Sequence, residues 1–182
     1  MSLANKISLG RILLVPCIVA SLVYYSPTRD GLRYVALALF VLGILSDAVD
    51  GFVARSQRQQ SPLGTILDPI ADKFLILGTL ISLSTIRGLP SWMRIPAWFN
   101  LIVISRDALL VIGTMLLFAF TGKVTIQPNR LGKWTVVAQM LVVPAVLLDL
   151  PWTLALLIIA ATMTALSAMS YVRLGAKLLE SR

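Results

Sequence analysis

The chain has 182 residues, 58% of them hydrophobic and 13% charged, and its 16 Lys and Arg outnumber 8 Asp and Glu, for a net charge of +8. Soluble domains are roughly half apolar and about a quarter charged, so this composition excludes an ordinary soluble domain and indicates an all-α integral membrane protein. The absence of histidine excludes Ser-His-Asp and Cys-His catalysis, and the single cysteine excludes an internal disulfide.

Six apolar runs approach the length of about 20 residues that a bilayer span needs. They are residues 7–25, 32–54, 63–86, 95–120, 134–150 and 152–174. Short connections with Pro, Gly and Asn separate them, so we expect one membrane domain, 1–182, built as a bundle of six transmembrane helices. The first run follows a basic start but has no convincing small-residue cleavage site, and we expect it to be retained as a helix. Pro144 predicts a kink or tilt in the fifth span.

Basic residues predict the orientation of these spans. If the N-terminus is cytoplasmic, the outer loops carry only Arg29, Arg33, Arg87 and Arg94. The inner side then carries ten cations, which are Lys6, Arg11, Arg55, Arg58, Lys123, Arg130, Lys133, Arg173, Lys177 and Arg182. Cytoplasmic loops of membrane proteins are enriched in Lys and Arg, so both termini are expected in the cytoplasm. In so hydrophobic a chain the positive charge favours lipid headgroups or phosphorylated substrates, and we expect no nucleic-acid partner.

Half of the acidic residues fall within one short window around the second and third spans, namely Asp47, Asp50, Asp68 and Asp72. The first two are spaced i,i+3 and the last two i,i+4, so each pair lies on one face of its helix. Both pairs are expected near the cytoplasmic ends of antiparallel neighbours. Four ionised carboxylates so close together would repel strongly unless cations neutralise them. Hard oxygen ligands favour Mg²⁺, Mn²⁺ or Ca²⁺, and a pair of such ions can clamp a pyrophosphate.

Small residues and a cation flank these carboxylates. Gly51 follows Asp50 and Gly64 precedes Asp68 by four, and each would let a phosphorylated ligand approach the backbone. Arg55 lies one turn beyond Gly51, where it can meet a phosphate. Two other interpretations remain open. The carboxylates could form salt bridges, Asp47 or Asp50 with Arg55 and Asp72 with Lys73, or they could line the pathway of a divalent-cation transporter.

The same residues resemble the signature of the CDP-alcohol phosphotransferase family of membrane enzymes, Asp-x-x-Asp-Gly-x-x-Ala-Arg followed after a spacer by Gly-x-x-x-Asp-x-x-x-Asp. Every fixed position matches, at Asp47, Asp50, Gly51, Ala54, Arg55, Gly64, Asp68 and Asp72. The family's six-helix architecture with cytoplasmic termini also resembles the whole predicted chain.

The resemblance implies a phospholipid-synthesising enzyme that displaces CMP from a CDP-linked lipid by attack of an alcohol on the phosphorus nearer the lipid. It implies that Asp47, Asp50, Asp68 and Asp72 hold two divalent cations, Mg²⁺ or Mn²⁺. Asp72 would also act as the general base, and the CDP-lipid site would be lined by Gly51, Ala54, Arg55 and Gly64. A homodimer, a bacterial inner-membrane location and an active site facing the cytoplasm are expected on the same ground.

The acceptor alcohol is suggested by residues outside the signature. The segments 5–11 and 129–135 resemble phosphatidylglycerophosphate synthases of this family, although the first is also shared by its cardiolipin synthases. This resemblance implies CDP-diacylglycerol as donor and glycerol 3-phosphate as acceptor. Arg106, Arg130 and Lys133 are then candidates to bind the acceptor phosphate, although Arg106 could instead pair with Asp107. The segments 105–110 and 164–171 look more like cardiolipin synthases, which use phosphatidylglycerol, so that acceptor is the alternative.

Overall fold

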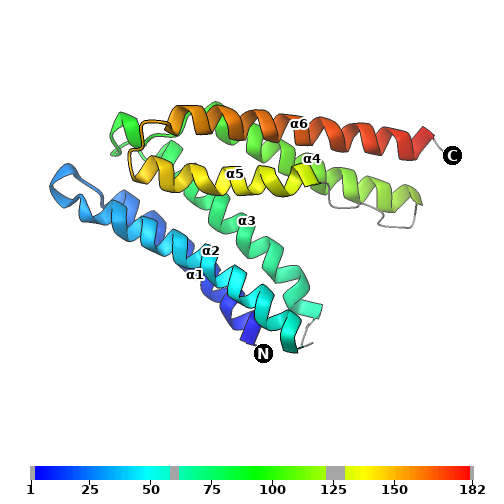
Figure 1. Ribbon diagram of the computed structural model, residues 1–182, viewed down its shortest axis with the longest axis horizontal. Helices are drawn as coiled ribbons and strands as arrows, with labels where there is room; N and C mark the ends of the chain where they lie inside the picture. Colours follow the sequence, from blue (N-terminus) through cyan, green and yellow to red (C-terminus); the bar gives the residue numbers. More distant parts are fainter. Residues whose placement is uncertain (1–2, 58–61, 122–129, 181–182) are drawn as a thin grey trace. The chain divides into compact units, whose positions relative to one another are not determined.

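The computed structural model describes residues 3–57, 62–121 and 130–180, with side chains described over 8–46, 69–116, 119 and 131–174. All regular structure in these ranges is helical (Figure 1). The long helices are α1 (Leu3–Val23), α2 (Gly31–Gln57), α3 (Pro62–Thr85), α4 (Ala97–Thr121), α5 (Arg130–Leu147) and α6 (Thr153–Glu180). Two short 3-10 helices, η1 (Pro27–Arg29) and η2 (Ser91–Met93), lie between them. Each predicted span overlaps one long helix, which confirms the all-helical prediction.

Two stretches of the described chain are long and apolar enough to cross a membrane, Ser91–Leu116 and Thr153–Leu174. Shorter apolar helical stretches cover Ser8–Val23, Gly31–Ser46 and Leu131–Leu147. Large apolar side chains stand exposed on α4 and α6, including Leu101, Met115 and Leu154. Extensive exposed apolar surface is unfavourable in water and typical of helices that face lipid. The number of spans and the side of the membrane on which the termini lie remain predictions.

The four tryptophans support the same environment. Trp92, Trp98, Trp134 and Trp152 lie in η2, near the start of α4, near the start of α5 and just before α6. All four are exposed. Exposed tryptophans at helix ends are typical of the boundary between lipid and water.

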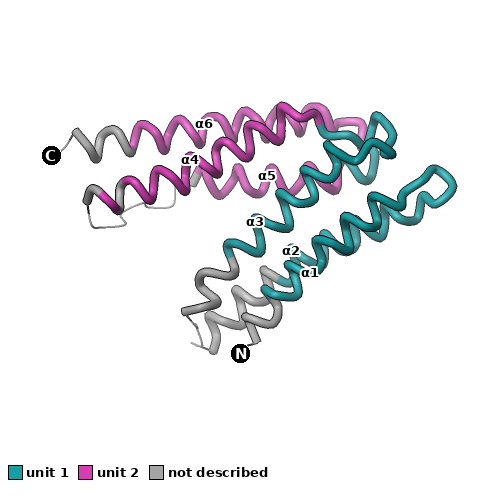
Figure 2. Tube along the Cα trace, turned by 180° about the vertical axis from the view of Figure 1, so that it is seen from behind, with its two compact units in different colours: residues 1–95, 146–149 teal, residues 96–145, 150–182 magenta. Residues whose placement is uncertain are grey.

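The chain divides into two compact units, which Figure 2 shows in different colours. Unit 1 comprises Met1–Ile95 and Val146–Asp149. Within it α1 packs against both α2 and α3, and α2 also contacts α3. Glycines permit the close approach, because a Cβ added to Gly78 would lie 2.7 Å from Val15 Cγ1 and one added to Gly43 would lie 2.5 Å from Leu75 Cδ2. The packing of unit 1 therefore depends on small residues at the helix contacts.

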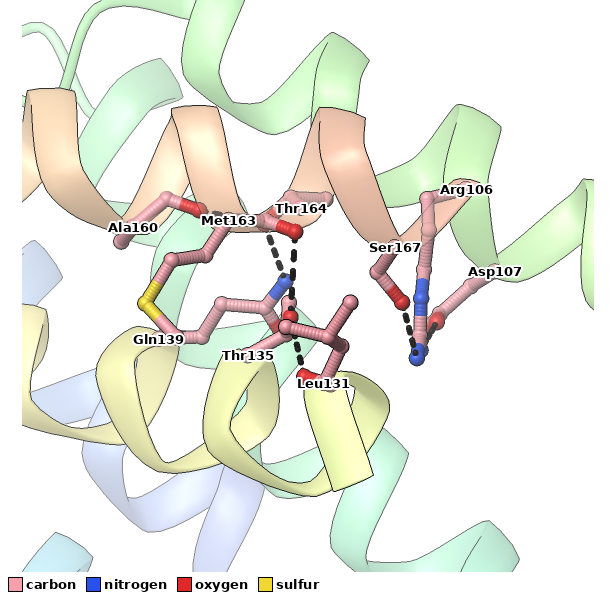
Figure 3. A network of polar contacts seen from close by, with 9 residues as sticks. All are labelled: Arg106, Asp107, Leu131, Thr135, Gln139, Ala160, Met163, Thr164 and Ser167. Atoms are coloured by element: carbon pink, nitrogen blue, oxygen red, sulfur yellow. Dashed lines mark hydrogen bonds and ion pairs between the residues drawn. The ribbon is translucent and has the colours of Figure 1, made fainter. Parts of the chain in front are cut away.

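Unit 2 comprises Pro96–Ala145 and Leu150–Arg182. In it α4 packs along α6, and hydrogen bonds connect α5 to α6. The buried amide of Gln139 donates to Thr164 Oγ1 at 3.0 Å, and Thr135 Oγ1 donates to the Met163 carbonyl at 3.2 Å (Figure 3). These hydrogen bonds lower the free-energy cost of burying polar side chains in the apolar contact between α5 and α6. The prediction of a single domain over 1–182 is not tested by this division.

Candidate functional site

The backbone places the four predicted metal ligands on two contacting helices. Asp47 and Asp50 lie toward the end of α2, whereas Asp68 and Asp72 lie in the first half of α3. The side chains of Asp47, Asp50 and Asp68 lie outside the described residues. The residues predicted to line the CDP-lipid site also lie outside the ranges whose side chains are described; they are Gly51, Ala54, Arg55 and Gly64. The helical spacing is therefore confirmed, and the meeting of the carboxylates stays a prediction.

Among the side chains that the structure describes, no three His, Cys, Asp or Glu gather closely enough to hold a metal ion. Asp72 is the predicted ligand that falls within those ranges, and its side chain is 28% exposed. A carboxylate offers about four lone-pair positions, so a hydrogen bond to one oxygen does not by itself exclude a cation. The hard oxygen of Asp72 and its partial exposure fit a divalent ion of the Mg²⁺ or Mn²⁺ type.

A buried arginine from another helix contacts this carboxylate. Arg11 of α1 donates from Nη1 to Asp72 Oδ1, across 61 positions in the chain, and forms an ion pair with it. The Arg11 side chain is 0% exposed, and Ser8, one turn earlier, is also buried. The sequence predicts Arg11 to be an inner cation at the end of the segment 5–11 and assigns it no role in the site. The available signal was a cation inside the first apolar run, because ionisable residues at membrane depth are usually paired and functional.

A second polar cluster, the Arg106 cluster, lies in unit 2 and comprises Arg106, Asp107, Ser167 and Tyr171. Arg106 is buried and donates from Nη1 to Asp107 Oδ1 at 2.8 Å and from Nη2 to Ser167 Oγ at 3.3 Å (Figure 3). Its guanidinium carbon lies 5.8 Å from the centre of the Tyr171 ring. The Arg106–Asp107 pair left open by the sequence is therefore formed, and Ser167 of α6 is an additional partner. Arg106 Nε is buried and has no hydrogen-bond partner among the described residues.

The first turn of α5 lies against the Arg106 cluster. A Cβ added to Gly132 would lie 3.0 Å from Tyr171 Oη and 3.1 Å from Arg106 Nη2, so a side chain there would require these groups to shift by a few tenths of an ångström. Lys133, the next residue, is exposed, whereas the side chain of Arg130 lies outside the described residues. Helix N-termini and guanidinium groups both favour anions. This end of unit 2 therefore has the chemistry to bind a phosphate, although Asp107 offsets part of the charge of Arg106.

The comparisons with known proteins agree with the signature. A family model described as CDP-alcohol phosphatidyltransferase matches residues 1–169. The chain belongs to this family. The match confirms the resemblance seen in the sequence. It also confirms the prediction of a membrane-associated helical protein.

Relatives of the chain are named for transfer to glycerol 3-phosphate or for the synthesis of cardiolipin. A Bacillus subtilis protein named CDP-diacylglycerol–glycerol-3-phosphate 3-phosphatidyltransferase is 36% identical over 84% of this chain and 80% of its own length. A Cereibacter sphaeroides protein with the same name is 28% identical over 78% of this chain and 61% of its own length. A Streptomyces coelicolor protein named cardiolipin synthase (CMP-forming) is 33% identical over 82% of this chain and 66% of its own length.

Proposed function

We propose that this protein is a phospholipid-biosynthetic transferase that moves the phosphatidyl group of CDP-diacylglycerol to glycerol 3-phosphate, releasing CMP and forming phosphatidylglycerophosphate. The observation that carries the proposal is the similarity to the Bacillus subtilis transferase named for this reaction, at 36% identity across 84% of the chain. The complete match to the family signature supports the same chemistry, because all four carboxylates and both glycines are present.

The carboxylates supply the site for the reacting diphosphate. Two divalent cations, Mg²⁺ or Mn²⁺, are proposed to bind Asp47, Asp50, Asp68 and Asp72. When bound, such ions neutralise the diphosphate and stabilise the entering and leaving oxygens. Gly51 and Gly64 let the backbone come close to the nucleotide, Ala54 leaves room beside it, and Arg55 binds a phosphate oxygen.

Asp72 is proposed to accept the proton of the acceptor hydroxyl. The freed oxygen forms a bond to the phosphorus nearer the lipid. The bond from that phosphorus to the bridging oxygen breaks, and CMP leaves with the bridging oxygen and its electron pair. Carboxylates can act as general bases, and the chain has no histidine that could take the role instead. The partial exposure of Asp72 is consistent with access for a small alcohol.

Glycerol 3-phosphate is a small dianion, and its phosphate needs cationic or N–H donors. We assign this role to Arg106, Arg130 and Lys133. The close approach of the α5 first turn to Arg106 supports the assignment, because it gathers a guanidinium and helix N–H groups in one place.

The alternative acceptor is phosphatidylglycerol, which would make the product cardiolipin. The Streptomyces coelicolor relative favours it, and so do the segments 105–110 and 164–171. For either acceptor we propose one membrane domain with six spans and cytoplasmic termini. We also propose a homodimer in a bacterial inner membrane whose active site faces the cytoplasm.

The choice of acceptor is tested with purified protein, CDP-diacylglycerol and Mg²⁺. Glycerol 3-phosphate or phosphatidylglycerol is supplied separately, while CMP release and the lipid product are followed. We expect CMP release and phosphatidylglycerophosphate with glycerol 3-phosphate alone. Cardiolipin formed from phosphatidylglycerol would establish the alternative. Movement of metal ions into vesicles without any CMP release would indicate a cation transporter instead of an enzyme.

A further inference from the structure

The ion pair between Arg11 and Asp72 differs from the pair between Arg33 and Asp30, which also belongs to unit 1. Arg33, in the first turn of α2, bonds Asp30 just before that helix, and both side chains retain some exposure. Arg11, by contrast, joins α1 to α3 and is fully enclosed. A buried charge is costly unless it is paired and hydrogen-bonded, so its retention in an apolar helix suggests a specific use.

The two partners differ in accessibility. The Asp72 side chain is 28% exposed and that of Arg11 is 0% exposed. An enclosed guanidinium is poorly placed to contact a substrate, whereas the carboxylate that it holds can be reached. The structure thus pairs an enclosed guanidinium with a partly exposed carboxylate. In this arrangement Arg11 can affect a substrate or metal ion only through Asp72.

We propose that Arg11 is a positioning residue that fixes the orientation of the Asp72 carboxylate. The proposal deepens the proposed function, since it rests on Asp72 serving as metal ligand and base. Partners of metal-ligating side chains orient those ligands and tune their affinity. Arginine suits the task because its guanidinium is planar, always charged and bonds a carboxylate with directional N–H groups.

The packing around the pair keeps it in place. Val15, one turn beyond Arg11, lies against Gly78, and a Cβ on that glycine would come within 2.7 Å of Val15 Cγ1. The backbones of α1 and α3 therefore approach closely one turn past the ion pair. A lysine at position 11 would keep the charge but lose the planar, directional contact, so the conservative substitution separates orientation from charge.

The test compares Arg11→Gln and Arg11→Lys with the control Arg33→Gln, which removes an ion-paired arginine from the same unit. For each protein we would measure kcat, the KM of both substrates, the Mn²⁺ dissociation constant with CDP-diacylglycerol but without acceptor, and the midpoint of thermal unfolding. Arg11→Gln is expected to lower kcat and weaken Mn²⁺ binding by roughly 10- to 100-fold. Arg11→Lys should fall between wild type and Arg11→Gln in both, and Arg33→Gln should leave both unchanged.

The proposal is overturned if Arg11→Gln keeps kcat and Mn²⁺ affinity within about twofold of wild type. It is also overturned if the lower kcat and Mn²⁺ binding of Arg11→Gln are fully explained by a smaller fraction of folded protein. If Arg11→Gln does not fold, Arg11→Lys decides instead. The proposal is then overturned if Arg11→Lys has the kcat and Mn²⁺ affinity of wild type. The Mn²⁺ measurement needs no acceptor, so an incorrect acceptor assignment would not affect it. A wild type that binds no Mn²⁺ refutes the proposed metal site, and kcat then decides the role of Arg11.

Discussion

Gly132→Ala tests the proposed acceptor site through a single methyl group. The added Cβ would lie 3.0 Å from Tyr171 Oη and 3.1 Å from Arg106 Nη2, closer than the usual contact of about 3.5–4.0 Å. Arg106 cannot easily retreat, because Nη1 is bonded to Asp107 at 2.8 Å and Nη2 to Ser167 at 3.3 Å. The second bond is already long, so a further shift of a few tenths of an ångström would break it.

Overpacking of this kind costs about 1–3 kcal/mol. If the cost falls on the arginine that binds the acceptor phosphate, the KM of glycerol 3-phosphate should rise about tenfold, since each 1.4 kcal/mol corresponds to a factor of ten. The KM of CDP-diacylglycerol should stay the same, because the nucleotide-binding residues proposed above belong to α2 and α3.

The assay measures initial rates of CMP release while each substrate is varied in turn. Gly113→Ala is the matched control, because Gly113 also lies in a helix of unit 2 and a Cβ there meets nothing within 4 Å. That control should keep both KM values and stabilise its helix by up to about 1 kcal/mol. An unchanged KM for glycerol 3-phosphate in Gly132→Ala, or an equal rise for both substrates, would refute the proposed role of the Arg106 cluster.

Three further predictions concern the helix contacts and the base. Gly78→Leu should destabilise unit 1 by about 1–3 kcal/mol, because even a Cβ would lie 2.7 Å from Val15; a thermal midpoint equal to wild type would contradict the packing. A double-mutant cycle of Gln139→Leu and Thr164→Val should give a coupling of about 0.6 kcal/mol, and additive effects would mean that their hydrogen bond contributes nothing. Asp72→Asn should abolish turnover while CDP-diacylglycerol still binds, and residual wild-type activity would remove Asp72 from the role of base.

The sequence predicts the helices well because membrane helices are specified mainly by long apolar runs. Their ends are predicted less well. The fifth helix begins at Arg130, before the predicted residue 134, and the sixth continues to Glu180, past the predicted residue 174. Both extensions contain charged residues, Arg130 and Lys133 in one and Lys177 and Glu180 in the other, which end an apolar run although the helix itself continues.

The candidate site divides along a similar line. The spacing of Asp68 and Asp72 predicts a shared helical face, because that relation depends on local periodicity alone. The contact between Arg11 and Asp72 joins residues 61 positions apart and depends on how α1 packs against α3. Periodicity carries no such information, so the sequence predicts no contact between Arg11 and the carboxylates. The pairing of Arg106 with Ser167 escaped prediction for the same reason.

The number of divalent ions held by the protein tests the central claim most directly. Equilibrium binding of Mn²⁺ to the purified wild type, with CDP-diacylglycerol present, should show two ions per chain. Asp68→Asn should lower that number, and the rate of CMP release should fall with it. Binding of no Mn²⁺, or full turnover after complete removal of divalent cations, would contradict the account.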